Sequence, residues 1–86
     1  YEQASKYLNQ IILHPESITL QYNEYRGNGV QTVPYKAAAY NLLGFIKTEE
    51  ADSKSALQMF KMALEVFPDY ILAKENLKQS QLKVRS

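Results

Sequence analysis

Residues 37–70, AAAYNLLGFIKTEEADSKSALQMFKMALEVFPDY, contain two apolar patterns of helical spacing separated by a polar segment. In the first half, apolar side chains recur at intervals of three and four residues: Ala39, Leu42, Leu43 and Ile46. The second half repeats the pattern with Ala56, Met59, Phe60, Ala63, Leu64 and Phe67. Such spacing is typical of one face of an α-helix. We therefore expect one helix after Pro34 and a second from Ser55 to Phe67, which Pro68 ends.

The polar segment between the two helices carries its own start signal. Asp52 and Ser53 are residue types that accept the free N–H groups of a first helical turn. The segment thus predicts a helix–turn–helix unit.

This unit resembles one complete tetratricopeptide repeat, a helix–turn–helix of about 34 residues with characteristic small and aromatic positions. The matching residues, in the family's order and without insertion or deletion, are Tyr40, Leu43, Gly44, Ala56, Phe60, Ala63 and Pro68. Lys47 departs from the pattern, which has an aromatic residue there. The resemblance implies that Gly44 and Ala56 are small because the two antiparallel helices approach most closely at these positions. The resemblance implies an all-α fold of about four or five helices in antiparallel helix–turn–helix repeats, a fragment of a right-handed superhelix.

The flanks resemble the family less closely. Residues 1–16 look like the second helix of a preceding partial repeat, and we expect a helix from Glu2 to Leu13. Residues 71–86 look like a polar capping helix, which repeat arrays need for solubility, with Asp69 as its N-terminal cap. We expect a single domain over residues 1–86.

Residues 17–33 match no full repeat. Ile18, Leu20 and Tyr22 alternate as in a strand, and Asn28-Gly29 is a good hairpin turn. Ile18, Tyr22 and Tyr25 also fit a helical stripe. We expect a short helix over 17–26 and a loop to about Thr32, either as a degenerate first helix or as an insertion.

Composition argues against several functions. The chain has no cysteine, and its ten basic and nine acidic side chains give a net charge of +1, below what nucleic-acid binding usually requires. No apolar run approaches the roughly 20 residues of a membrane span. His14 is the sole histidine, and Glu49, Glu50 and Asp52 lack the spacing of a calcium loop. We expect no catalytic activity, metal or cofactor.

Tyrosine is abundant, with seven residues. Tyr40 belongs to the repeat pattern. Tyr7, Tyr22, Tyr25 and Tyr35 have no such assignment, and each can serve either core packing or a binding surface, where tyrosine is enriched.

In tetratricopeptide proteins, the first helices of successive repeats line a concave groove that holds a peptide or a partner helix. Carried over to this chain, the groove positions are Ala38, Asn41, Phe45 and Thr48, followed by Leu72, Glu75, Gln79 and Leu82. The resemblance therefore implies a non-catalytic protein-interaction module. The family's chaperone clamp requires Lys and Asn where this chain has Asn41 and Phe45, so we expect no such clamp.

The alternative is an architectural or oligomerisation segment of a larger protein. The N-terminal helix has an apolar stripe: Ala4, Leu8, Ile11 and Ile12. Without a repeat partner of its own, this stripe could pair with a second copy and form a homo-oligomer.

Overall fold

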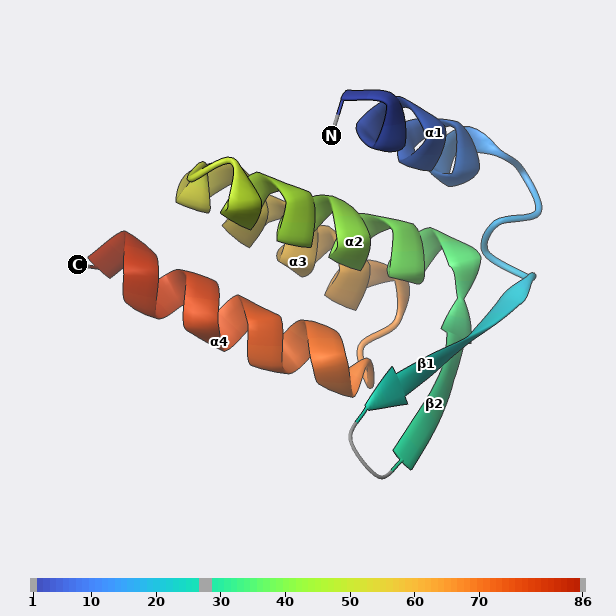
Figure 1. Cartoon of the computed structure of the whole chain (residues 1–86). Helices are drawn as coiled ribbons and strands as arrows, with labels where there is room; N and C mark the ends of the chain where they lie inside the picture. Colours follow the sequence, from blue (N-terminus) through green and yellow to red (C-terminus); the bar gives the residue numbers. More distant parts are fainter. Residues whose placement is uncertain (1, 27–28, 86) are drawn as a thin grey trace.

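The computed structural model describes residues 2–26 and 29–85, which form a compact, mostly helical domain with a small β-hairpin (Figure 1). The elements, in chain order, are α1 (Glu2–Leu13), β1 (Gln21–Arg26), β2 (Gly29–Pro34), α2 (Tyr35–Glu49), α3 (Ser53–Val66) and α4 (Ile71–Arg85). Each predicted helix outside residues 17–33 is present, with ends within about two residues of those expected. None of the helices in the described ranges is long and apolar enough to cross a bilayer.

The helical hairpin of α2 and α3 is the centre of the domain (Figure 1). Gly44 faces Phe60 so closely that a Cβ added to the glycine would lie 2.6 Å from Cδ1 and 2.7 Å from Cζ of the Phe60 ring. Ala56 and Ala63 on α3 are fully buried. Small side chains therefore allow the close approach of the two helices, as their positions in the sequence predicted.

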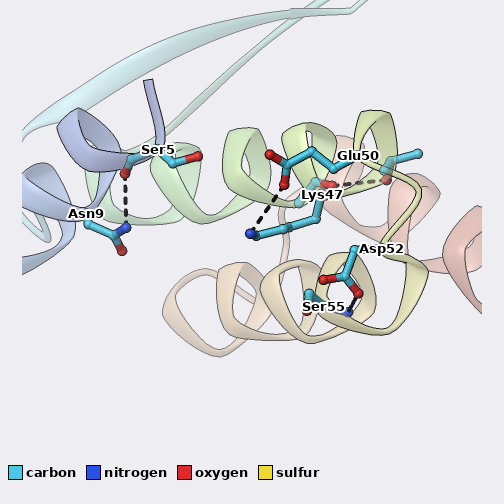
Figure 2. A network of polar contacts seen from close by, with 8 residues as sticks. Ser5, Asn9, Lys47, Glu50, Asp52 and Ser55 are labelled. Atoms are coloured by element: carbon cyan, nitrogen blue, oxygen red, sulfur yellow. Dashed lines mark hydrogen bonds and ion pairs between the residues drawn. The ribbon is translucent and has the colours of Figure 1, made fainter. Parts of the chain in front are cut away.

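The turn between α2 and α3 closes both helix ends with hydrogen bonds. The Asp52 N–H donates to the carbonyl of Lys47 at 2.8 Å, and the Ala51 N–H donates to the carbonyl of Thr48 at 3.0 Å. This pair of bonds is a Schellman motif, and Ala51 occupies its left-handed position with φ of 62°. The Asp52 carboxylate then accepts the Ser55 N–H at 3.2 Å, which confirms the predicted cap (Figure 2).

Residues 21–26 and 29–34 pair as the two strands of an antiparallel β-hairpin, so the expected helix over 17–26 and the loop to Thr32 are wrong. The all-α prediction is likewise corrected to a mostly helical fold with one hairpin. Tyr22 lies opposite Val33 and Glu24 opposite Gln31, which places these four side chains on one face of the hairpin. The predicted turn residue Asn28 falls outside the described residues.

The hairpin is held by its contacts with the start of α4. Val33 is fully buried in a cluster that includes Ala37, Tyr70 and Ala73. Gln31 accepts the Ile71 N–H at 2.8 Å and donates to the Asp69 carbonyl at 2.6 Å. The first turn of α4 is thus capped by a side chain from β2, whereas the sequence suggested Asp69. Since these contacts are distant in sequence, local pattern analysis could not anticipate them.

Helix α1 packs on the opposite side of α2 from α4 (Figure 1). Leu8 and Ile12 are buried against three residues of α2, namely Ala39, Leu43 and Ile46. The expectation of an uncovered apolar stripe on α1 is therefore incorrect for Leu8 and Ile12, although Ala4 is exposed. A hydrogen bond from the Asn9 side chain to the Ser5 carbonyl, 3.0 Å long, lies on the solvent side of the helix (Figure 2).

Candidate binding groove

A groove of about 710 Å³ opens between α1, β1, α2 and α4. This volume lies within the usual range of ligand sites, roughly 300–1,000 Å³. The residues that line the groove are Tyr7, Leu8, Ile11, Tyr22, Glu24, Tyr35, Ala38, Ala39, Asn41, Leu42, Phe45, Leu72 and Asn76. Helix α2 contributes six of these residues, more than any other element. The end of β2 leads directly into the start of α2 (Figure 1).

Half-exposed aromatic side chains form much of the wall. Tyr7 is 64% exposed and Phe45 is 51% exposed. Tyr22 and Tyr35 stand together with ring centroids 6.0 Å apart and their planes inclined by 56°. Large apolar side chains left open to water in one concavity are typical of a surface that a partner covers.

Hydrogen-bonded polar groups lie between these aromatic side chains. Asn41 is buried, and its side-chain oxygen accepts a 3.1 Å hydrogen bond from Asn76 on α4. The fully buried Tyr70 donates its hydroxyl to Oε1 of Glu24 at 2.7 Å. Burial, followed by the hydrogen bond to Glu24, raises the pKa of Tyr70 well above its ordinary value. The phenol therefore stays protonated and keeps donating to the carboxylate at neutral pH.

The structure brings four of the residues predicted from the sequence into this groove: Ala38, Asn41, Phe45 and Leu72. Thr48 does not line it and instead donates to the Gly44 carbonyl at 3.0 Å. Glu75, Gln79 and Leu82 are exposed on α4 but do not line the groove either. The side of α4 that faces the groove runs through Leu72 and Asn76, which are one helical turn apart.

Glu24, Leu42 and Asn76 also line the groove, although their sequence pattern did not predict them there. Of the four unassigned tyrosines, Tyr7, Tyr22 and Tyr35 line the groove, and the Tyr25 side chain is outside the described part. The signal that could have found Glu24 is its spacing of two residues from Tyr22, because such residues share a face in a strand.

A second, smaller cavity of about 260 Å³ lies at the C-terminal end of α1 and is lined by Gln10, Ile11, His14, Ser17, Leu20 and Tyr35. His14 Nδ1 accepts the Glu16 N–H at 3.1 Å, so this nitrogen serves the local turn. Within residues 2–26 and 29–85, no group of three or more His, Cys, Asp or Glu side chains is placed to hold a metal ion.

Comparisons of the chain with models of protein families, with curated proteins and with solved structures find no match. The resemblance of residues 37–70 to a tetratricopeptide repeat accordingly rests on the spacing of the residues themselves.

Proposed function

We propose that this chain is a non-catalytic protein-interaction module of the tetratricopeptide type, which binds a peptide segment or a partner helix in the groove. The observation that carries the proposal is the set of half-exposed aromatic and aliphatic side chains that line one concavity. Leu42 and Phe45 lie there with 49% and 51% exposure, although both belong to the central helix α2. A partner that covers them gains the free energy of apolar burial, about 25 cal/mol for each Å².

In this proposal, α2 and α3 make up one repeat and α4 begins the next. Helix α1, which packs directly on α2, corresponds to the second helix of a preceding repeat. The hairpin of β1 and β2 is then an insertion between these two helices and not a degenerate first helix. Its inner face adds Tyr22 and Glu24 to a groove that helices alone would otherwise line.

The groove also favours a protein partner over a nucleic acid. Phosphate binding requires Lys, Arg or an array of free N–H groups, and the described lining residues include no basic side chain. The oligomerisation alternative relied on the apolar stripe of α1. This alternative is weakened, because Leu8 and Ile12 of that stripe are already buried within one copy.

The test is selection of binding peptides on the intact chain, followed by measurement of their dissociation constants by calorimetry. The double variant Leu42→Ala/Phe45→Ala removes two exposed groove side chains, so the fold should persist. Asn41 is unsuitable because its change would leave Asn76 without its partner.

We expect the double variant to weaken the selected peptides by about tenfold or more, as for aromatic anchors of other interfaces. The matched control is Leu13→Ala, which removes an exposed leucine outside the groove and should leave affinity unchanged. Peptides that bind the double variant as tightly as the parent, or a failure to select any peptide, would refute the proposal. Sedimentation in parallel would reveal a dimer if the architectural alternative holds.

A further inference from the structure

The groove has a distinct electrostatic character. Among its described lining residues, Glu24 is the one that carries a formal charge. The chain as a whole has a net charge of +1, with ten basic side chains, and no lysine or arginine lines the groove in the described part. The site is therefore locally acidic on a slightly basic molecule.

The Glu24 carboxylate is fixed in place. Its Oε1 accepts the hydroxyl of Tyr70 at 2.7 Å, and Tyr70 itself is fully buried beneath the hairpin. The strand alternation of β1 places Glu24 on the same face as Tyr22. Because both residues line the groove, the charge stands beside an aromatic wall.

The aromatic wall suits the same kind of ligand as the carboxylate. Tyr22 and Tyr35 are 43% and 39% exposed and both line the groove, so each side chain has surface that a group in the groove can contact. Aromatic faces attract cations, and a carboxylate close by adds direct charge attraction. The remaining wall is apolar, which matches the long methylene stems of lysine and arginine.

From charge complementarity and these neighbours, we infer that the groove selects a partner peptide with one basic side chain, lysine or arginine, flanked by apolar residues. The cationic head lies between Glu24 and the pair Tyr22 and Tyr35, and the flanking apolar residues contact Leu42, Phe45 and Leu72. The inference rests on the proposed function and names the chemistry of its ligand. An acidic segment is disfavoured, because no basic side chain among the described lining residues would meet it.

The experiment uses four series of synthetic peptides that share the same flanking apolar residues. The central residue is arginine, lysine, norleucine or glutamate. Binding of each series to the intact chain is measured by fluorescence anisotropy in solution. We expect the arginine and lysine series to bind about tenfold tighter than the norleucine series, from the combined cation–π and ion-pair contributions. The glutamate series should bind most weakly.

The variant Glu24→Gln tests the residue directly. Glutamine retains an oxygen that can accept the Tyr70 hydroxyl, so the hairpin should stay docked, and thermal melting checks this. The preference for a basic residue should fall to about twofold or less in Glu24→Gln. The matched control, Glu49→Gln, makes the same change in net charge at an exposed position outside the groove and should keep the full preference.

The outcomes separate the two proposals. Equal binding of the norleucine and basic series, with binding still lost in Leu42→Ala/Phe45→Ala, would overturn the inference and leave the protein-interaction function standing. Absence of binding by every series would count against both. A basic preference that survives in Glu24→Gln would also overturn the inference, because the charge attraction would then come from elsewhere.

Discussion

Replacement of Gly44 by alanine tests the packing of α2 against α3 at its closest point. The added methyl group would meet three atoms of the Phe60 ring, at 2.6 Å for Cδ1, 2.7 Å for Cζ and still closer for Cε1. Real Cβ atoms essentially never approach a neighbour within 3.0 Å. Phe60 is only 2% exposed, so its ring has no free space into which it can swing.

Two opposing effects decide the result. Alanine in place of glycine within a helix stabilises it by about 1 kcal/mol. Overpacking of a buried contact costs about 1–3 kcal/mol, and three ring atoms within this range place Gly44→Ala near the upper end. The net expectation is a loss of about 1–2 kcal/mol, which lowers the melting temperature by roughly 5–15 °C in a domain of this size.

Urea denaturation followed by circular dichroism measures the loss, and a double-mutant cycle assigns it. In a Phe60→Leu background, the smaller side chain relieves the overlap, and Gly44→Ala should then stabilise by up to about 1 kcal/mol. The change of sign is the decisive result. If Gly44→Ala raises stability while Phe60 is intact, the helices do not approach as closely as described and the packing argument fails.

Two further predictions concern the caps and the buried phenol. Ala51→Gly should stabilise the chain by about 0.5–1 kcal/mol in denaturant titration, because glycine adopts the left-handed position of the Schellman motif without strain. A loss of stability in Ala51→Gly would contradict that backbone geometry. The pKa of Tyr70 is raised in the folded chain above its value in the unfolded chain. The contribution of Tyr70 to stability is therefore fully present below about pH 10 and is lost as the pH rises further. Tyr70→Phe should therefore reduce the slope of stability against pH above pH 10 by up to about 1.4 kcal/mol per unit, and an unchanged slope would show that the Tyr70 phenol does not carry it.

The helices could be predicted from the sequence because their signals are local. The stripe of α3, the cap at Asp52 and the ending before Pro68 each depend on residues within a few positions of one another. The close approach at Gly44 could also be predicted, because the sequence pattern pairs this small residue with the aromatic Phe60 on the next helix. The prediction of these helices therefore does not depend on where the rest of the chain lies.

The hairpin, and with it the part of the groove that β1 forms, could not be predicted in the same way. Residues 17–33 fit both a strand and a helical stripe, and the strand form is stabilised by contacts with α2 and with residues around the start of α4. Val33 gains its burial from Tyr70 and Ala73, while Gln31 gains its partners at Asp69 and Ile71. The two-residue spacing of Tyr22 and Glu24 can place both on one face of a strand, but only the docking of the hairpin decides that this face lines the groove.

The docking of the hairpin has a consequence for the order in which the domain folds. A two-stranded hairpin alone is marginally stable at best in water, so β1 and β2 depend for their persistence on contacts with α2 and with the chain around the start of α4. The bonds that hold them join residues 46 positions apart for Tyr70 with Glu24 and 38 positions apart for Gln31 with Asp69. Closing loops of this length has an entropic cost that the helical hairpin of α2 and α3 does not incur.

We therefore expect the end of the groove with Tyr22 and Glu24 to form late in folding and to open early in local unfolding. Under the proposed function, a ligand that contacted these residues would bind only the closed arrangement and would stabilise the hairpin by the free energy of its own binding. Recognition by this end of the groove and completion of the fold would then be one coupled equilibrium.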